Sequence, residues 1–171
     1  MVPEIKKILY TTDLSKNSAY AFFYAADMAK NHNARIVILH SIEPIRPIYA
    51  EGEVFRVEAI LGRAKKQEEE TDLEEIKKRL LEFCRRTENH VGPCVELVSK
   101  ILVPIGHPVE EILKAADEES CDVIVLGTHG KGFLKQTFLG SVAGSVLERT
   151  RKPVFIIPSP FEKNHIDWDK I

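Results

Sequence analysis

Short apolar segments alternate with amphipathic ones along this chain, and this alternation restricts the fold more than any other feature. Residues 35–41 and 121–127 are almost continuously apolar, which is typical of strands covered on both faces, as in a parallel sheet. Shorter runs at 5–13, 95–103 and 153–158 complete five expected strands. Because helical segments separate these strands, the order β-α-β-α-β-α-β-α-β predicts an α/β fold with helices on both faces of a parallel sheet.

The spacing of apolar residues also places the helices. Ser15 offers an N-cap for a first helix that ends near residue 31. An apolar stripe with charged i,i+4 pairs predicts a long second helix over 65–86 with a solvated charged face. Pro108 suits the first turn of a third helix. A fourth is expected over 141–150, and its inward positions are Val142, Val146 and Leu147.

The composition narrows the classes of protein. The 171 residues are enough for one domain with a substantial core. The 24 basic and 26 acidic residues give a formal net charge of −2, without the basic excess of a generic nucleic-acid binder. No apolar run reaches the roughly 18–20 residues that a membrane helix needs, and residues 1–7 lack the apolar stretch of a signal peptide. We therefore expect a cytoplasmic protein with neither nucleic acid nor membrane as a partner.

The three cysteines, Cys84, Cys94 and Cys121, are expected to be free structural thiols. Their number is odd and no two have the CxxC spacing, so a disulfide framework is not indicated. The six histidines form no ligand-spaced pair with these thiols, which argues against a zinc site.

Polar and glycine-containing segments follow two of the expected strands, where ligands bind in an open α/β sheet. Residues 11–13 end the first strand, the segment 127–132 with three glycines follows the fourth, and Gly140-Ser141 opens the last helix. Glycine lets a ligand approach the backbone closely, and the free N–H groups and dipole of a helix N-terminus suit a phosphate. These features predict a phosphate-binding loop. A glycine turn with a serine N-cap and no ligand is the alternative.

This loop does not match two well-known phosphate-binding templates. Gly130-Lys131 is followed by Gly132 rather than Ser or Thr, so GxxxxGK[ST] is absent. Position 135 is lysine rather than the glycine that GxGxxG requires. Both templates also belong after the first strand in their usual folds. We therefore set aside a Walker-type ATPase and a Rossmann dehydrogenase.

The spacing Gly127-x2-Gly130-x9-Gly140-Ser141 resembles the G-2x-G-9x-G-[ST] signature of ATP-binding universal stress proteins. Four further segments resemble that family in the same order. They are 7–15 for its first strand, 106–112 for G-x-P-x-x-x-I, 139–142 for LGSV and 152–154 for K-P-V. The resemblance covers about residues 6–158, nearly the whole chain.

The resemblance implies a flavodoxin-like or Rossmann-like three-layer sandwich, with a five-stranded parallel sheet of order 3-2-1-4-5 and helices on both faces. The family domain is expected over residues 1–158, and 159–171 form a C-terminal tail. Residues 43–64 form an insertion that varies in the family. Two prolines break this insertion early, and its apolar residues fit either a short helix or a lid.

The same resemblance implies a site for ATP, or for ADP or AMP, together with Mg²⁺, at the ends of the first and fourth strands. Its residues are Thr11, Thr12, Asp13, Ser41, Gly127, Thr128, His129, Gly130, Gly140, Ser141 and Val142. Asp13 accepts from ribose hydroxyls or contacts the metal indirectly, and the phosphates lie on the last four residues of that set. The residues alone leave other roles open: a helix-start acid for Asp13, an N-cap for Ser141, an exposed loop for His129 and a packed core position for His40.

Two positions depart from the family pattern. Thr11 stands where the family often has proline, and Ser41 stands where an apolar residue often lines the adenine pocket. The second departure loosens the adenine assignment, although backbone contacts at this position remain available.

The function implied by the resemblance is a nucleotide-responsive stress and signalling protein that acts through conformational or partner changes. Its protein partner is unknown. No catalytic residue is expected, because Asp13 already has a binding role and no nucleophile–base pair is apparent. ATP hydrolysis is therefore expected to be slow at most. The alternatives are a true ATPase or adenylate-handling enzyme, and a dimeric interaction scaffold that binds no nucleotide.

The last strand is short and apolar, and an exposed sheet edge of this kind needs cover. The resemblance implies a homodimer through this strand, with the interface residues Val154, Phe155, Ile156 and Ile157. Cover by the chain's own residues 161–171 is the alternative.

Overall fold

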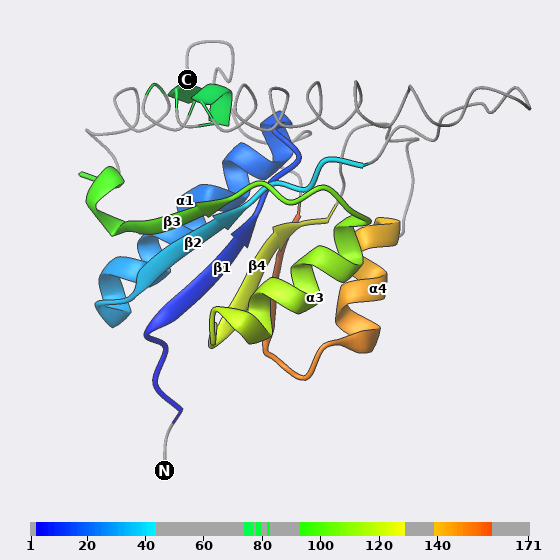
Figure 1. Cartoon of the computed structure of the whole chain (residues 1–171). Coiled ribbons are helices and arrows are strands. Elements are labelled where there is room, and N and C mark those ends of the chain that lie inside the picture. Colours follow the sequence, from blue (N-terminus) through cyan, green and yellow to red (C-terminus); the bar gives the residue numbers. More distant parts are fainter. Residues whose placement is uncertain are drawn as a thin grey trace, which may run out of the picture.

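A computed structural model describes residues 3–43, 74–76, 78–79, 82, 93–128 and 139–158 of the chain. Five strands form one sheet in the order β3-β2-β1-β4-β5 (Figure 1). They are β1 Lys7–Thr11, β2 Arg35–Leu39, β3 Val98–Leu102, β4 Val123–Gly127 and β5 Val154–Ile157. Every neighbouring pair is parallel. The expected flavodoxin-like sheet and its strand order are therefore confirmed.

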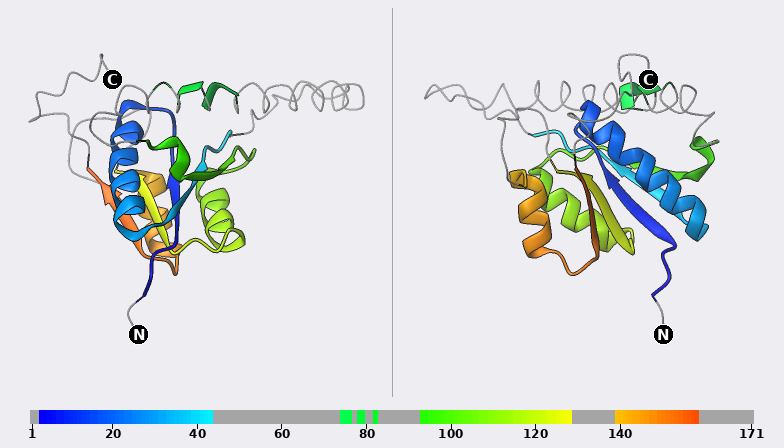
Figure 2. Two further views of the ribbon diagram at one scale, coloured as in Figure 1. Left: turned by 90° about the vertical axis from the view of Figure 1, so that its left-hand side faces the viewer. Right: turned by 180° about the vertical axis from the view of Figure 1, so that it is seen from behind.

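Among the described residues, three helices cover the two faces of this sheet. They are α1 Lys16–His32, α3 Pro108–Glu118 and α4 Ser141–Arg149. In Figure 1 α3 and α4 lie in front of the sheet, and the view from behind in Figure 2 has α1 in front. The arrangement is a three-layer sandwich, in which every strand needs apolar residues on the helix-covered faces.

Alternating residues of the strands feed two separate cores. Ile8 and Tyr10 of β1 point to the α1 side, where they pack with Phe22. Leu9 points to the other side, where it packs with Val109 of α3 and Val146 of α4. The period of two along each strand thus divides one apolar run between both helix layers.

The helix ends follow the capping signals in the sequence. Ser15 is the N-cap of α1 and its side chain accepts a hydrogen bond from the Ser18 N–H, as expected. Asn33 ends the helix in the left-handed conformation, with φ 51°, which is a common helix terminator. Pro108 begins α3 at its expected position.

Several expectations need correction or lie outside the described residues. The predicted strand at 95–103 begins with a short 3₁₀ helix, η1 Val95–Leu97, and β3 follows it. Leu147 is 50% exposed rather than inward. The described residues of the predicted helix 65–86, namely 74–76, 78–79 and 82, are helical, and Ile76 in its apolar stripe is buried. Residues 44–64 and the tail 159–171 lie outside the described residues.

The expectation of free thiols is wrong for Cys94, which is disulfide-bonded and buried just before η1. Cys121 is a free, buried thiol, and burial raises its pKa to about 11. Cys84 lies outside the described residues. An odd number of cysteines and their spacing do not reveal which thiols the fold brings together, because a disulfide requires proximity in space.

Reduction of the Cys94 disulfide is expected to lower the free energy of unfolding by about 2–4 kcal/mol, because the cross-link restricts the unfolded chain. Urea unfolding with and without a thiol reductant measures the difference. The Cys94→Ser variant should resemble the reduced wild type and no longer respond to the reductant. Cys121→Ser is the matched control and should keep the response. Equal stabilities of the oxidised and reduced wild type would contradict this prediction.

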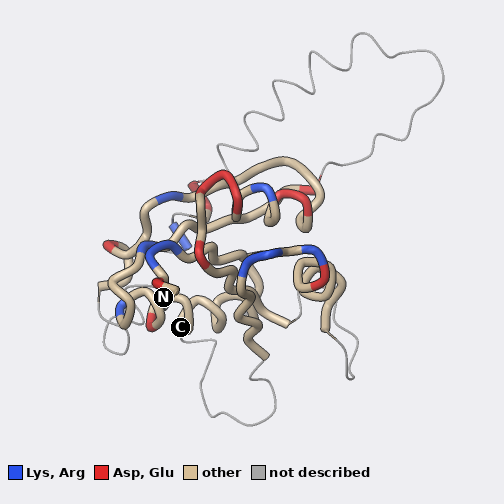
Figure 3. The backbone as a smooth tube through the Cα atoms, turned by 90° about the horizontal axis from the view of Figure 1, so that it is seen from below, with Lys and Arg blue, Asp and Glu red and all other residues tan. Residues whose placement is uncertain are grey.

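Charged residues of both signs lie at the amino ends of the strands (Figure 3). The Asp122 carboxylate accepts hydrogen bonds from the backbone N–H groups of Lys6 and Lys7, at 2.7 and 2.8 Å. Lys7 Nζ donates to the Glu119 carbonyl at 2.8 Å. These contacts tie the N-terminal segment to the end of α3, at the edge of the sheet opposite the carboxyl ends of the strands.

Candidate functional site

The strand order places a topological switch point between β1 and β4, because β1 pairs with both β2 and β4. Ligands of open α/β folds bind beyond the carboxyl ends of the strands at such a point. The structure brings nine of the predicted site residues to this edge: Thr11, Thr12, Asp13, Ser41, Gly127, Thr128, Gly140, Ser141 and Val142. His129 and Gly130, and the lysines that follow them, lie outside the described residues.

Thr12 holds the loop that leaves β1. Its backbone N–H donates to the Leu39 carbonyl at 2.9 Å, which extends the pairing of β1 with β2. Its hydroxyl donates to Ser18 Oγ at 2.8 Å and accepts from the Leu14 N–H at 3.0 Å. Thr12 thus connects the end of the strand to the first turn of α1.

Asp13 lies between this connection and the helix. Its Oδ1 accepts hydrogen bonds from the Ser15 backbone N–H at 3.0 Å and from Ser15 Oγ at 2.5 Å. Leu14, which separates the two residues, has φ 62°, a left-handed conformation that is uncommon for a residue other than glycine. The carboxylate is therefore oriented by its neighbours and not only by the positive end of the helix dipole.

The buried hydroxyl of Tyr10 holds the first turn of α1, to which this loop is bonded. Tyr10 Oη donates to the Ser18 carbonyl at 2.6 Å. Burial raises the pKa of Tyr10 well above its usual range, so the phenol stays neutral at physiological pH and remains a donor. No sequence pattern distinguishes Tyr10 or Ser18 as supports, because one is an alternating strand residue and the other is a serine within a helix.

The segments that follow β2 and β3 remain paired after the two strands end. An isolated parallel bridge joins Ile42 to Ile105, and Ser41 Oγ donates to the Gly106 carbonyl at 2.8 Å. The serine that departs from the family pattern therefore bonds to the neighbouring loop. His40 Nδ1 lies 2.8 Å from the Thr12 carbonyl, so the expectation of a packed core histidine does not describe its role fully.

The carboxyl end of β4 is bonded to the start of α4. The Gly140 N–H donates to the Thr128 carbonyl at 2.8 Å, and the Thr128 N–H donates to the Ile157 carbonyl at 2.9 Å. Gly140 is the N-cap of α4 and makes no side-chain cap hydrogen bond. Ser141 is the first helical residue and is exposed. The alternative role of Ser141 as an N-cap is therefore wrong.

This helix end lacks the groups that ordinarily neutralise it. The first turn of α4 contains no acidic residue and its N-cap has no side chain. The first N–H groups of a helix have no partner within the helix, and they carry a positive partial charge. An anion at this position would satisfy both the hydrogen bonds and the charge.

Thr128 adds a second feature at the same place. Its hydroxyl oxygen is buried and has no hydrogen-bond partner among the described residues. A buried hydroxyl without a partner costs free energy, and such groups in folded proteins usually contact water, an ion or a ligand. Thr128 also accepts a hydrogen bond from the Gly140 N–H through its carbonyl, so its hydroxyl is a polar group available to a ligand near the start of α4.

Among the described residues, no cluster of three or more His, Cys, Asp or Glu side chains is arranged to hold a metal ion. Asp13 offers a carboxylate at this edge, beside which a bound phosphate group could supply further oxygen ligands. Mg²⁺ suits such an arrangement, because it keeps several waters and is commonly held by phosphates with one or two carboxylates. Of the described helices, none has the length and apolar character to cross a membrane.

Comparison with known proteins gives a consistent result. The model of the "Universal stress protein family" matches residues 4–158. The universal stress protein MJ0577 of Methanocaldococcus jannaschii is 32% identical over 155 residues, which cover 89% of this chain and 94% of that protein. A universal stress protein of Thermus aquaticus is 32% identical over 152 residues, which cover 89% of this chain and 98% of that protein.

Solved structures agree with these sequence matches. The structure of MJ0577 has a TM-score of 0.67 and covers 95% of this chain and 99% of its own. A universal stress protein in complex with cAMP has a TM-score of 0.53 at 21% identity and covers 91% of this chain and 98% of its own. At that identity the likeness concerns the fold.

Proposed function

Because the chain belongs to the universal stress protein family, we propose that it binds an adenine nucleotide where β1, β4 and α4 meet. ATP is the proposed ligand, and ADP and AMP use the same adenosine contacts. Binding would change the conformation of the protein or its choice of partner, which makes it a nucleotide-responsive protein of the stress response. The proposed domain is residues 1–158, with 43–64 as its insertion.

The start of α4 is the observation that carries this proposal. Its uncapped N–H groups and exposed Ser141 hydroxyl suit phosphate oxygens. Thr128, whose hydroxyl has no partner among the described residues, is bonded to the same turn because its carbonyl accepts from the Gly140 N–H. We assign the phosphates to Gly130, Gly140, Ser141 and Val142, with His129 and Thr128 at the edge of the phosphate group.

The adenosine is assigned between the ends of β1 and β4, near Asp13 and the backbone around Ser41. The oriented Asp13 carboxylate accepts hydrogen bonds from ribose hydroxyls, and the backbone near Ser41, with Thr11 and Gly127, borders the base. Mg²⁺ bound to the phosphates would neutralise their charge, and Asp13 would reach it through water. This role of Asp13 fits the usual coordination of Mg²⁺, in which the protein supplies one or two carboxylates and the bound phosphates and waters supply the other oxygen ligands.

Calorimetric titration with ATP, ADP and AMP, each with and without Mg²⁺, tests the proposal. We expect saturable binding of one nucleotide per chain and slow release of phosphate at most. cAMP is a useful further probe, since a protein of this fold was solved with it. Absence of binding for every nucleotide would favour an interaction scaffold, and rapid turnover that is lost with the site would favour an ATPase.

The ribose assignment predicts a selective loss in the Asp13→Asn variant, which keeps the size of the side chain but removes its charge. Affinity for ATP should fall about tenfold, the value of one hydrogen bond to a charged acceptor. Affinity for 2′,3′-dideoxy-ATP, which lacks the ribose hydroxyls, should change less than about twofold on the same grounds, when both titrations omit Mg²⁺ so that only the ribose contact is compared. Equal losses for the two nucleotides in calorimetry would speak against this role of Asp13.

A further inference from the structure

His40 makes a hydrogen bond that links two elements of the proposed site. It follows β2 directly, and its Nδ1 lies 2.8 Å from the Thr12 carbonyl oxygen. A carbonyl oxygen can only accept, so Nδ1 carries the hydrogen and donates it. The His40 backbone N–H donates in turn to the Leu102 carbonyl of β3 at 2.9 Å. This backbone bond attaches His40 to β3, while its ring bonds to the loop that leaves β1.

The accepting carbonyl belongs to the peptide unit that joins Thr12 to Asp13. A peptide unit is planar, so fixing its oxygen fixes the direction of the bond to the next residue. The Thr12 N–H already bonds to Leu39 at 2.9 Å. That N–H belongs to the preceding peptide unit, so the imidazole bond is the attachment of the Thr12–Asp13 peptide itself, and it lies on the side nearer Asp13.

The chain beyond this peptide is in a conformation that needs support. Leu14 has φ 62°, and residues other than glycine stay in this region only when their surroundings hold them there. Ser15 holds one oxygen of Asp13 from the helix side. His40 holds the preceding peptide from the sheet side, so the loop is attached at both ends of the acidic residue.

We propose that His40 is a positioning residue for nucleotide recognition. Its Nδ1–H donor fixes the Thr12–Asp13 peptide and so aims the Asp13 carboxylate at the ribose hydroxyls. This inference rests on the proposed function. It explains how one side chain, His40, sets the orientation of Asp13 towards the ribose. His40 itself touches neither the ribose nor the phosphates in this account.

Three substitutions separate the donor from the bulk of the ring. His40→Leu removes the donor and keeps an apolar side chain of moderate size. His40→Asn places an amide N–H close to the position of Nδ1, whereas His40→Gln places it nearer to that of Nε2. His32→Leu is the matched control, because His32 is an exposed histidine at the other end of α1.

Calorimetry with ATP and 2′,3′-dideoxy-ATP is the main test. In His40→Leu, affinity for ATP should fall about tenfold and affinity for the dideoxy nucleotide less than about twofold, as expected for the loss of a single contact. His40→Asn should restore most of the ATP affinity, and His40→Gln should not. Adding His40→Leu to Asp13→Asn should cost little more, because the two residues act through one contact.

A spectroscopic measurement tests the hydrogen bond between His40 and Thr12 in the absence of nucleotide. Nitrogen-15 NMR of the imidazole should show His40 protonated at Nδ1 in the neutral ring, and His32→Leu should leave this signal unchanged. A ring protonated only at Nε2 would overturn the inference even if His40→Leu failed to fold. Equal losses for both nucleotides in His40→Leu, in a wild type that binds ATP, would also overturn it. A wild type that binds no nucleotide would overturn the proposed function and this ribose role together.

Discussion

Replacing Ser141 with aspartate will abolish measurable nucleotide binding at micromolar concentrations. The substitution places a carboxylate in the first turn of α4, where the N-cap is a glycine and no other acidic residue lies. A negative charge there satisfies the helix dipole itself and repels the phosphates. Like charges brought together at a binding site cost several kcal/mol, so affinity for ATP should fall by about 100-fold or more.

The fold is expected to tolerate this change, because Ser141 is exposed and an acidic residue suits a helix start. Leu147→Asp is the matched control. It adds the same charge near the other end of α4, at a side chain that is 50% exposed, and it should bind ATP like the wild type. Ser141→Ala, which loses only the hydroxyl, should weaken binding about threefold to tenfold. If Ser141→Asp bound ATP as tightly as the wild type, the assignment of the phosphates to this helix end would be contradicted.

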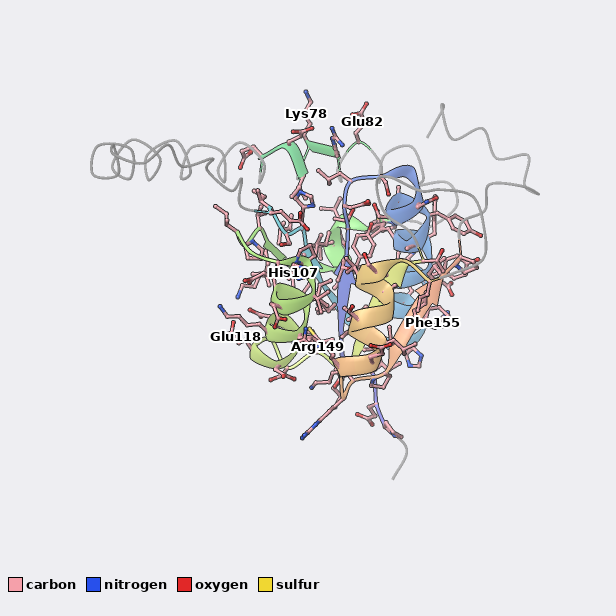
Figure 4. All side chains as sticks on the ribbon, turned by 90° about the vertical axis from the view of Figure 1, so that its right-hand side faces the viewer. Lys78, Glu82, His107, Glu118, Arg149 and Phe155 are labelled. Atoms are coloured by element: carbon pink, nitrogen blue, oxygen red, sulfur yellow. The ribbon has the colours of Figure 1, made fainter. Side chains whose placement is uncertain are left out.

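We propose that the wild type is a homodimer through β5, and we expect the Phe155→Asp variant to be a monomer. β5 is the last strand of the sheet, and an apolar edge strand is a template for pairing with another chain. Phe155 is 42% exposed there, and Figure 4 shows it on the side of the molecule away from α3. We propose that β5, with Val154, Ile156 and Ile157, forms the interface between two copies.

An aromatic cluster on α1 extends this apolar edge. The Phe155 ring centroid lies 6.3 Å from that of Tyr24, which is 39% exposed. Tyr24 in turn packs edge-on against Tyr20 at 5.3 Å, and their hydroxyls lie 2.9 Å apart. Aromatic side chains contribute strongly to protein interfaces, so a carboxylate amid this cluster should prevent association.

Light scattering after size exclusion measures the mass of each variant. Val95→Asp is the matched control, because Val95 is also 42% exposed but lies in η1, next to the opposite edge strand β3. It should remain a dimer. A dimer mass for Phe155→Asp would contradict the assignment, and a monomeric wild type would point to cover of the edge by residues 161–171.

The fold was predictable because its determinants are local and periodic. Ile36 to Leu39 and Val123 to Leu126 are apolar without a break and are buried on both faces of the sheet. Such runs indicate parallel strands. Ser15 and Pro108 mark helix starts by their own chemistry. The strand order came from the resemblance of spaced glycines and flanking segments to a known family, not from periodicity.

The positions of the site residues were predictable for a similar reason, since the carboxyl ends of parallel strands meet at one edge of the sheet. Their individual roles were less accessible. Gly140, rather than Ser141, is the N-cap of α4, and the boundary of a helix depends on backbone angles that a serine after a glycine does not determine. The orphaned hydroxyl of Thr128 depends on its surroundings in space.

Contacts between residues far apart in the sequence explain the remaining differences. The His40 bond to Thr12 spans 28 positions, and neither residue type in isolation predicts it. The disulfide of Cys94 likewise depends on proximity that cysteine spacing does not reveal. Leu147 fits the apolar period of α4 and is nevertheless exposed, whereas Ala143 and Val146 are the buried residues of that helix.

The nucleotide content of the purified protein is the sharpest test of whether it binds ATP. The full chain is purified without added nucleotide and denatured, and the released small molecules are identified by chromatography and mass spectrometry. A protein with both Gly140→Asp and Ser141→Asp is treated in parallel. The account predicts ATP or ADP in the wild type, or saturable uptake of Mg-ATP if it is isolated empty, and neither in the variant. A wild type that carries no nucleotide and takes up no Mg-ATP would contradict it.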